Sequence, residues 1–364
     1  MDGKKVLSQL APYKQGMQID EVKKKYHLEK IVKLASNENP YGYSERLKHA
    51  FSHITDELHI YPDGHTAQLR SALASKLAIN ENQLIFGNGS DEIVQIISRT
   101  FLYPGVNTVM ATPTFPQYKH HALIDGADIK EIPTINGYHD LNGMLQAIDK
   151  NTKVVWICSP DNPTGTILPP DDFYQFMDQC PKDVLVVLDE AYYEFIDEAS
   201  RLQALSTLPS YKNLILLRTF SKAYGLAALR IGYGIMAEDI ASQLNIVRGP
   251  FNTSTIAQQA ALIALDDQSF IKNVTTKNRE IKQRFEVFLD EIGWHYYPSQ
   301  TNFILVSTPI SGTEVSQYLL KNGFIIRPGE LLGYPKTIRI TIGTDEDMIQ
   351  LQHLLKKLHV EINE

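Results

Sequence analysis

The chain has 364 residues, 43% of them hydrophobic and 21% charged, with a formal net charge of -7 at pH 7. This is ordinary globular composition, and the length suits one large domain together with a smaller one. The acidic balance argues against a nucleic-acid surface, two cysteines cannot build a disulfide framework, and no apolar run approaches the roughly 18 residues of a membrane span.

Predicted strands alternate with helical patterns over the first two thirds of the chain. Continuous apolar or β-branched runs occur at Leu84–Phe86, Thr108–Met110, Lys153–Ile157, Val184–Leu188, Leu214–Leu217 and Ile231–Ile235. Helical patterns lie between several of them, including 91–101 and 170–179. This alternation predicts an α/β three-layer sandwich with a mostly parallel central sheet. Because such sheets bind ligands at the carboxyl ends of their strands, we expect the functional residues there.

The pattern changes after about residue 251. Helices are predicted at 254–265, 271–292 and 345–358, with short strands at 294–297, 302–306, 324–326 and 338–342. We therefore divide the chain into an N-terminal arm that also belongs to the small domain (1–40), a large domain (41–252) and a small C-terminal α+β domain (253–364). The lysine-rich N-terminus lacks the apolar segment of a secretory signal, so we expect a cytoplasmic protein without a membrane or nucleic-acid partner.

The segment Gly87–Glu92 joins a predicted strand to a predicted helix. Backbone N–H groups at such a helix start can bind an anion, which makes Ser90 and Asp91 candidate phosphate-binding residues. Glu92 stands where a dinucleotide-binding fingerprint has its third glycine, which argues against a Rossmann site. The alternative is that Ser90 or Asp91 merely caps the helix.

The segment Asp161–Gly165 follows the strand predicted at 153–157. Its proline and glycine are typical of a plain turn, which an asparagine also favours. The other interpretation is that the amide of Asn162 donates a hydrogen bond to a ring oxygen of a cofactor.

Asp189 follows the apolar run Val186–Leu188. An acid at a strand end can pair with a protonated pyridine nitrogen. An apolar run followed by Asp-Glu also resembles the metal-binding strand of an ATPase, but that interpretation requires a GxxxxGK[ST] loop, and the chain has none. The histidines lack metal-ligand spacing as well, so we expect no metal.

Lys222 follows the strand predicted at 214–217. A lysine amine can form an imine with an aldehyde when burial or a neighbouring cation lowers its pKa, although most lysines are solvated surface charges. Ser221 precedes it, and Arg230 follows eight residues later. Because a hydroxyl and a guanidinium bind phosphate, this segment predicts a site for a phosphate-bearing aldehyde.

These segments together resemble an enzyme family. Three segments resemble motifs of the fold-type I, class II aminotransferases and have the same order and approximate spacing: Asn162–Gly165, Asp189–Tyr192 and Ser221–Arg230. Further segments narrow the resemblance to the histidinol-phosphate aminotransferases: Ser36–Pro40, Tyr61–Gly64, Gly89–Glu92 and the pair Arg327 and Arg339. The resemblance runs from about residue 11 to residue 344. One departure is Ala228, where relatives often have glycine.

The resemblance implies a pyridoxal 5'-phosphate enzyme with assigned cofactor contacts. Lys222 would carry the cofactor as a Schiff base and shuttle the proton, and Asp189 would hold the pyridine N–H. Asn162 and Tyr192 would bond the phenolic oxygen. Phe115 would stack on the ring, where a purely core position is the alternative.

The resemblance also implies how the cofactor phosphate and the substrates are held. The residues expected at the phosphate are Ser221, Arg230 and the backbone of Ser90 and Asp91. Tyr61 would reach that phosphate from the partner subunit, which implies a homodimer. Arg339 would bind the carboxylate of glutamate, although an arginine on an alternating strand could simply face solvent. Those expected at the other, phosphate-bearing substrate are Arg327, Tyr13, Asn37 and Asn302.

The activity implied is transfer of an amino group between glutamate/2-oxoglutarate and imidazole-acetol phosphate/histidinol phosphate, a step of histidine biosynthesis. Three alternatives remain open. An aromatic amino-acid aminotransferase would depend less on Arg327, and a phosphothreonine-type decarboxylase would keep phosphate recognition but release carbon dioxide. A cofactor-sensing regulator would need an attached DNA-binding domain, for which the first 30 residues are too short.

Overall fold

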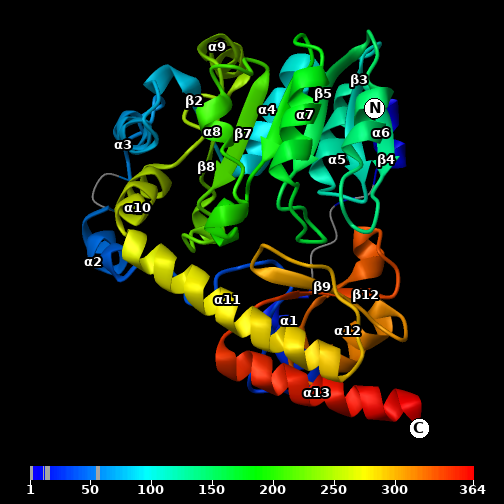
Figure 1. The fold of residues 1–364 in the computed structure, drawn as a ribbon. Helices are drawn as coiled ribbons and strands as arrows, with labels where there is room; N and C mark the ends of the chain where they lie inside the picture. The colour runs from blue at the N-terminus through cyan, green and yellow to red at the C-terminus, as the bar shows by residue number, and fades with distance from the viewer. Residues whose placement is uncertain (1–2, 11, 13–16, 55–57) are drawn as a thin grey trace.

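The computed structural model describes residues 3–10, 12, 17–54 and 58–364. Figure 1 shows an upper unit built on a large sheet and a lower unit in which two long helices, α11 (Gln268–Glu291) and α13 (Asp345–Asn363), lie beneath small sheets. The candidate substrate residue Tyr13 lies outside the described residues. None of the helices in the described ranges combines the length and apolar character that a membrane crossing needs.

The large sheet has seven strands. In chain order they are β2 (Leu84–Gly87), β3 (Asn107–Thr112), β4 (Asp128–Pro133), β5 (Thr152–Cys158), β6 (Leu185–Asp189), β7 (Leu214–Thr219) and β8 (Gly232–Ile235). Their spatial order is β2-β8-β7-β6-β5-β3-β4. Only β8 runs against its neighbours, because both of its pairings are antiparallel and the other four are parallel. The predicted α/β sandwich with a mostly parallel sheet is confirmed.

Helices cover both faces of this sheet. The helices along the chain before α11, of which α1 lies in the lower unit, are α1 (Ile19–Tyr26), α2 (Glu45–Ile54), α3 (Ala67–Leu77), α4 (Ser90–Phe101), α5 (Gln117–Asp125), α6 (Leu141–Ala147), α7 (Pro170–Gln179), α8 (Ala204–Thr207), α9 (Glu238–Val247) and α10 (Thr255–Asp266). On one face Val186 and Leu188 of β6 join a core with Phe173 of α7. On the other face Val187 joins a core with Ile93 of α4. Two covered faces explain why β6 is apolar at every position before Asp189.

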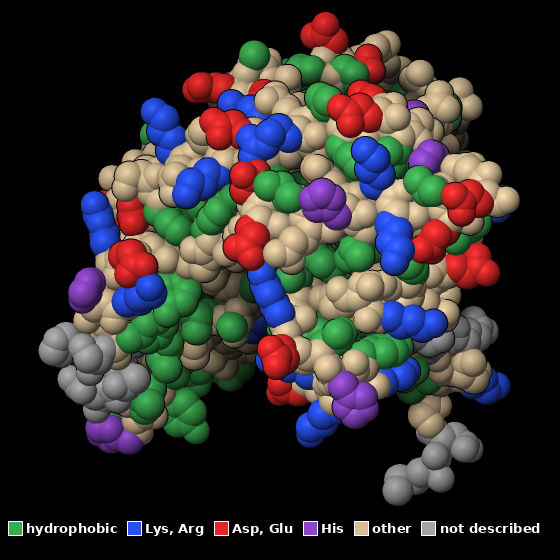
Figure 2. Space-filling view, turned by 90° about the horizontal axis from the view of Figure 1, so that it is seen from below, with side chains coloured by type: hydrophobic (Ala, Val, Ile, Leu, Met, Phe, Trp, Pro, Cys, Tyr) green, Lys and Arg blue, Asp and Glu red, His purple; other side chains and the backbone are tan. Residues whose placement is uncertain are grey.

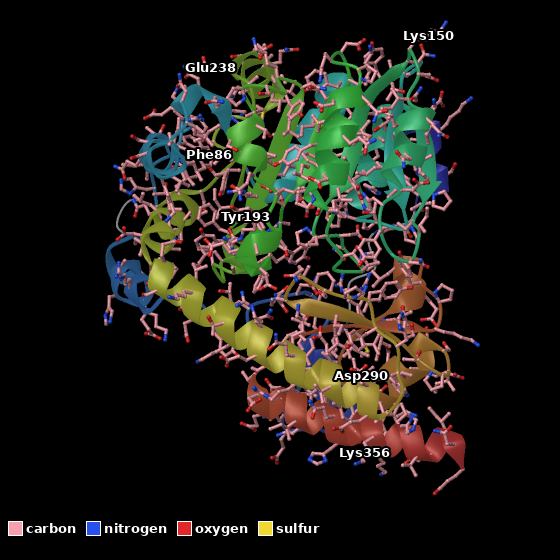
Figure 3. All side chains as sticks on the ribbon, in the orientation of Figure 1. Phe86, Lys150, Tyr193, Glu238, Asp290 and Lys356 are labelled. Carbon is pink, nitrogen blue, oxygen red and sulfur yellow. The ribbon has the colours of Figure 1, made fainter. Side chains whose placement is uncertain are left out.

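The carboxyl ends of the parallel strands face the lower unit. In Figure 3, Lys150, which precedes β5, lies at the top of the molecule, whereas Tyr193, which follows β6, lies near α11. The short helix that begins at Tyr193 also contacts α11. The edge at which the sequence predicts functional residues is therefore the edge that meets the other unit.

The lower unit has its own core and two small sheets. The elements after α11 are β9 (Phe303–Ser307), α12 (Gly312–Lys321), β10 (Phe324–Ile325), β11 (Arg327–Pro328) and β12 (Thr337–Thr341). Strands β11, β12 and β9 form one antiparallel sheet, and β10 pairs in parallel with β1 (Val32–Lys33). The N-terminal segment is thereby linked to the lower unit; the boundaries 1–40, 41–252 and 253–364 stay our proposal.

Several elements differ from the prediction. Strand β4 has the sequence DIKEIP, whose charged residues suit an edge strand with little burial, so it lacks the apolar run used to find the other strands. A strand at 294–297 is wrong, because that segment forms only an isolated bridge between Tyr296 and Val306. The last helix runs to Asn363, five residues beyond the predicted end.

Candidate functional site

A cavity of about 580 Å³ lies where the carboxyl edge of the sheet meets the lower unit. Loops after β2, β3, β5, β6 and β7 form one side, and residues of β11 and β12 form the other. Twelve of the fifteen predicted site residues line it: Asn37, Ser90, Asp91, Phe115, Asn162, Asp189, Tyr192, Ser221, Lys222, Arg230, Arg327 and Arg339. A cavity of this size is ordinary for a small-molecule site.

Lys222 lies in the turn after β7. Its amine donates to the carbonyl of Ser36 at 3.3 Å and lies 5.6 Å from the centre of the Tyr192 ring. Burial lowers the pKa of Lys222 to about 8, and the positive charge of Arg339 adds to the effect. Ordinary lysines are almost fully charged at neutral pH, whereas this one keeps a reactive fraction of free amine.

The turn that holds Lys222 depends on a glycine. Gly225 has a φ of +73° and donates its N–H to the Lys222 carbonyl at 2.9 Å. A Cβ at this position would lie 1.9 Å from the carbonyl oxygen of Gly42. Any larger residue would force these two loops apart.

Asp189 is the last residue of β6 and is buried. Its carboxylate accepts hydrogen bonds from the Tyr118 hydroxyl at 2.7 Å and from the Ala191 N–H at 3.1 Å. Burial raises the pKa of Asp189 to about 6, although both hydrogen bonds oppose that rise. A cationic group placed beside this carboxylate would be stabilised by it, because opposite charges favour the ionised form of both partners.

Phe115 occupies the loop after β3 and is half-buried at the cavity wall. Its ring meets the Tyr118 ring edge-on, with centroids 5.4 Å apart and planes at 74°. Tyr118 in turn stacks on Trp156, with centroids 4.9 Å apart. Phe115 is therefore an aromatic face at the cavity that rests on a row of rings.

Asn162 meets the lower unit directly. The side-chain oxygen of Asn162 accepts a hydrogen bond from the Arg339 guanidinium, which also donates to the Ala35 carbonyl at 3.0 Å. The same guanidinium lies 5.2 Å from the centre of the Phe303 ring. Arg339 points to the site and is 7% exposed, so the solvent-facing alternative is wrong.

Tyr192 and Asn37 are joined across the two units. The Asn37 amide donates to the Tyr192 hydroxyl at 2.8 Å, and burial raises the pKa of that hydroxyl. Thr341 of β12 accepts from the Asn37 N–H at 2.9 Å. Asn302 does not line the cavity; its amide donates to the Asn37 carbonyl at 3.0 Å, so it supports Asn37 from behind.

The start of α4 and the Arg230 side chain form an anion-binding corner. Arg230 donates to the Ser221 hydroxyl at 3.2 Å and lies 3.8 Å from the Asp91 carboxylate. The N-cap of α4 is Gly89, so the expectation that Ser90 or Asp91 merely caps the helix is not what the structure shows. A Cβ on Gly89 would lie 2.5 Å from the end of the Arg230 side chain, and the φ of +76° at Gly89 also favours glycine there. The free N–H groups of the first turn and the guanidinium then share one corner.

Arg327 and Arg339 are opposite one another in the antiparallel pair β11 and β12. Their side chains are 8% and 7% exposed. Like charges directly opposite in a sheet are destabilising, and burial increases the effect. The pair therefore favours an anionic ligand at this wall of the cavity.

One predicted residue, Tyr61, lies elsewhere. Tyr61 is 79% exposed, stacks on Phe251 with centroids 4.9 Å apart and does not line the cavity. Tyr13 lies outside the described residues.

Other residues of the site were missed by the sequence analysis. The main one is Tyr118, whose hydroxyl donates a hydrogen bond to Asp189. The feature of the sequence that could have pointed to it is its position three residues after Phe115. Leu331 and Leu332 also line the cavity from the lower unit. Nothing in their local sequence marks them, because only the fold brings that segment to the site.

Comparison with known proteins places the chain in a family. The model of the aminotransferase class I and II family matches residues 29–358. The histidinol-phosphate aminotransferase 2 of Oceanobacillus iheyensis is 55% identical, with all of both chains covered. The histidinol-phosphate aminotransferase of Bacillus subtilis is 51% identical, with 98% of this chain and 99% of that protein covered.

Solved structures agree. The histidinol-phosphate aminotransferase of Sinorhizobium meliloti in complex with pyridoxal 5'-phosphate superposes with a TM-score of 0.90 at 27% identity, over 99% of this chain and 98% of that one. An aspartate aminotransferase of Thermus thermophilus shares the fold, with a TM-score of 0.85 at 20% identity over 98% of this chain and all of that one. The chain therefore belongs to the class I and II aminotransferases, and among them to the histidinol-phosphate aminotransferase family.

Proposed function

We propose that this protein binds pyridoxal 5'-phosphate through Lys222 and transfers an amino group between glutamate and imidazole-acetol phosphate, giving 2-oxoglutarate and histidinol phosphate. The observation that carries the proposal is the placement of the Lys222 amine, the buried Asp189 carboxylate and the anion-binding corner around one cavity.

The residues present fit this cofactor. Asp189 is a buried carboxylate whose partners are two neutral donors, so it can still accept a pyridine N–H. The corner of Arg230, Ser221 and the α4 N-terminus has the donors that a phosphate requires. Its geometry depends on the absence of a side chain at Gly89.

Pyridoxal phosphate supplies an aldehyde for the amino group and an electron-withdrawing ring that stabilises negative charge at the reacting carbon. Lys222 would hold that aldehyde and, once free, would take the proton from the substrate Cα and deliver it to the cofactor carbon that carried the aldehyde, as its lowered pKa allows. Asp189 would keep the ring nitrogen protonated, and Asn162 and Tyr192 would bond the ring oxygen. Phe115 would fix the plane of the ring and exclude water from one face.

The substrates proposed are anions that suit the arginine pair. Arg339, beside Lys222, would hold a carboxylate of glutamate, while Arg327 would hold the phosphate of histidinol phosphate, which has no carboxylate. Glutamate must use the same space with its second carboxylate. An arginine binds either group, because carboxylate and phosphate both accept two parallel hydrogen bonds from its guanidinium.

The aromatic amino-acid aminotransferase remains the second candidate. Leu331 and Leu332 add apolar surface to the cavity, which suits a phenyl ring as well as an imidazole. The two functions differ in whether the amino donor carries a phosphate ester, as histidinol phosphate does, or a carboxylate, as phenylalanine does, and Arg327 is the residue that distinguishes them.

We also propose a cytoplasmic homodimer in which Tyr61 reaches the partner subunit's site. Leu58, Ile60 and Tyr61 are between 55% and 79% exposed, which is unusual for neighbouring large apolar residues. Figure 2 shows hydrophobic side chains gathered at the left of the face seen from below. Such a surface favours burial against a second copy. Both cysteines are unpaired, which supports a reducing compartment.

Arg327→Gln tests the substrate assignment. Removing this guanidinium should raise KM for histidinol phosphate at least about tenfold, the equivalent of about 1.4 kcal/mol, and leave KM for phenylalanine within about threefold. Steady-state kinetics with both donors measure the split. Arg279→Gln, which removes a half-exposed arginine paired with Asp197, is the matched control and should change neither constant. An unchanged KM for histidinol phosphate in Arg327→Gln would contradict the assignment.

A further inference from the structure

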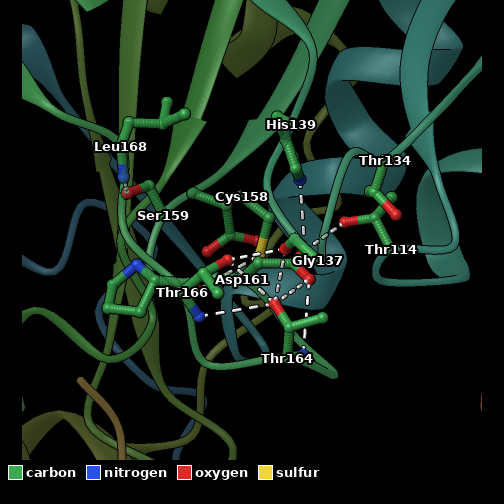
Figure 4. Close-up of polar contacts among 12 residues, drawn as sticks. Thr114, Thr134, Gly137, His139, Cys158, Ser159, Asp161, Thr164, Thr166 and Leu168 are labelled. Carbon is green, nitrogen blue, oxygen red and sulfur yellow. Dashed lines mark hydrogen bonds and ion pairs between the residues drawn. The ribbon is translucent and has the colours of Figure 1, made fainter. Parts of the chain in front are cut away.

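A buried carboxylate lies directly behind the proposed ring-binding residues. Asp161 is 1% exposed and precedes Asn162 in the turn after β5. Figure 4 shows its side chain at the centre of a polar cluster that the proposed cofactor contacts do not include. A buried charge is costly unless it is paired and hydrogen-bonded, so such a group needs a function that explains it.

The Asp161 carboxylate joins three segments that are distant in sequence. One oxygen accepts from the Thr114 hydroxyl at 2.6 Å and lies 3.2 Å from His139 Nε2. The other oxygen accepts from the Thr164 hydroxyl at 2.9 Å. Thr114 is the residue before Phe115, so a single carboxylate ties the loop of the aromatic face to the loop of Asn162.

A purely local role explains only part of this arrangement. An aspartate often stabilises its own turn, and the contact with Thr164, three residues later, is of that kind. The contacts with Thr114 and His139 span 47 and 22 residues, and the His139 side chain is itself 1% exposed. A turn does not require a buried histidine or a hydroxyl from another strand end.

The same turn is also attached to the lower unit. The Gly165 carbonyl accepts from the Gln300 N–H at 2.8 Å, and Asn162 accepts from Arg339. A movement of Asp161 would therefore displace the Asn162 side chain relative to both Phe115 and the substrate-facing arginine. These contacts make the cluster a frame for the cavity wall.

We propose that Asp161 is a positioning residue that fixes Phe115 and Asn162 relative to one another, with His139 as its buried partner. This inference rests on the proposed function, because the cluster can position cofactor-binding groups only if the cofactor ring lies between Phe115 and Asn162. Asp161 itself touches neither cofactor nor substrate.

Thr114→Val tests the frame with little change of shape. It removes the hydroxyl that binds Asp161 and keeps the volume and the β-branch. Because the hydrogen bond that ties the loop of Phe115 to Asp161 is lost, we expect the Kd of the apo protein for pyridoxal phosphate to rise at least about tenfold. Thr114→Ser retains the hydroxyl and should restore Kd to within about twofold. Thr100→Val is the matched control, since this half-buried hydroxyl only donates to the Ile96 carbonyl of its own helix.

Asp161→Asn and the double variant complete the test. If Asp161 acts through Thr114, Thr114→Val should weaken cofactor binding less in the Asp161→Asn background than in the unaltered protein, because an amide oxygen accepts a weaker hydrogen bond from Thr114 than a carboxylate does. The absorbance spectrum of the bound cofactor should shift in Thr114→Val and not in Thr100→Val. The thermal midpoint of the apo protein should be lower in Thr114→Val than in Thr114→Ser, because only the former loses the hydrogen bond to the buried carboxylate.

Three outcomes would overturn the proposal: a Kd and spectrum in Thr114→Val equal to the unaltered protein, an equal loss in Thr114→Ser, or fully additive effects in the double variant. Failure of the proposed function is recognised separately, because the unaltered protein would then bind no cofactor at Lys222 or leave histidinol phosphate unreacted. If the unaltered protein does both and Thr114→Val matches it, only the positioning role fails.

Discussion

Burial acts in opposite directions on the pKa values of the two ionisable groups at the centre of the site. The pKa of Asp189 rises to about 6, and that of Lys222 falls to about 8. For Asp189 the folded-state pKa lies above the unfolded one, so its contribution to stability is greatest below about pH 4 and is lost as pH rises through 6. A rise of about two pKa units corresponds to about 3 kcal/mol. This is the order of magnitude by which the buried Asp189 carboxylate lowers the folding stability of the apo protein at neutral pH.

The reactivity of Lys222 should follow its lowered pKa. Below pH 8 the amine is mostly protonated, so the rate at which the apo protein takes up pyridoxal phosphate should rise with pH and reach half its maximum near 8. Stopped-flow absorbance measures this rate. Arg339→Gln should move the midpoint upward, because that positive charge lowers the pKa of Lys222. Lys150→Ala, which removes an exposed lysine, should leave the profile unchanged; a midpoint near the ordinary 10.5 would refute the assignment.

At the scale of elements, the sequence predicts which residues lie at the carboxyl ends of the strands, but it does not predict the contacts that their side chains make. Asp189 and Lys222 follow continuous apolar runs, so their place at the carboxyl edge could be read from the sequence. Tyr118 was missed because α5 has no clear apolar periodicity. The opposition of Arg327 and Arg339 depends on the register of β11 and β12, and a strand of two residues such as β11 does not reveal its register in sequence.

Gly232 of β8 offers a test of how the sheet shapes the anion-binding corner. A Cβ there would lie 2.5 Å from the Ser90 N and 2.8 Å from the Gly89 carbonyl carbon, which are backbone atoms and cannot swing aside. Gly232→Ala should therefore displace the start of α4, raise the Kd for pyridoxal phosphate at least about tenfold and destabilise the protein by about 1–3 kcal/mol. Gly249→Ala is the control, because nothing lies within 4 Å of its Cβ. Calorimetric titration of the apo proteins measures the difference, and equal affinities would contradict this account.

At the scale of the whole molecule, the cavity is built by both units and completed, in our proposal, by a second chain. The sheet supplies Lys222 and Asp189, while the lower unit supplies Arg327 and Arg339. Sequence patterns predict the two units but not how the units contact each other, because contacts such as that of Asn162 with Arg339 join residues 177 positions apart.

Mixed dimers test the proposed crossing of Tyr61. Tyr61→Ala and Lys222→Ala should each lose most of their activity as pure dimers, because each lacks one component of every site. In a mixed dimer one site combines the intact Lys222 of one chain with the intact Tyr61 of the other. Co-expression with two affinity tags should therefore restore about half of one dimer's activity. Sedimentation should give twice the chain mass, and a fully active monomer would contradict the dimer.

The central claim is that the Lys222 site takes an amino group from histidinol phosphate. The most direct measurement is a half-reaction on the purified holoenzyme with histidinol phosphate, phenylalanine or glutamate as the sole amino donor and no acceptor. The account predicts that histidinol phosphate and glutamate each release about one equivalent of keto product per chain, and that Lys222→Ala releases none. If phenylalanine reacts and histidinol phosphate does not, the substrate assignment is wrong. If Lys222→Ala reacts like the unaltered protein, the assignment of Lys222 as the reactive residue of the site is wrong.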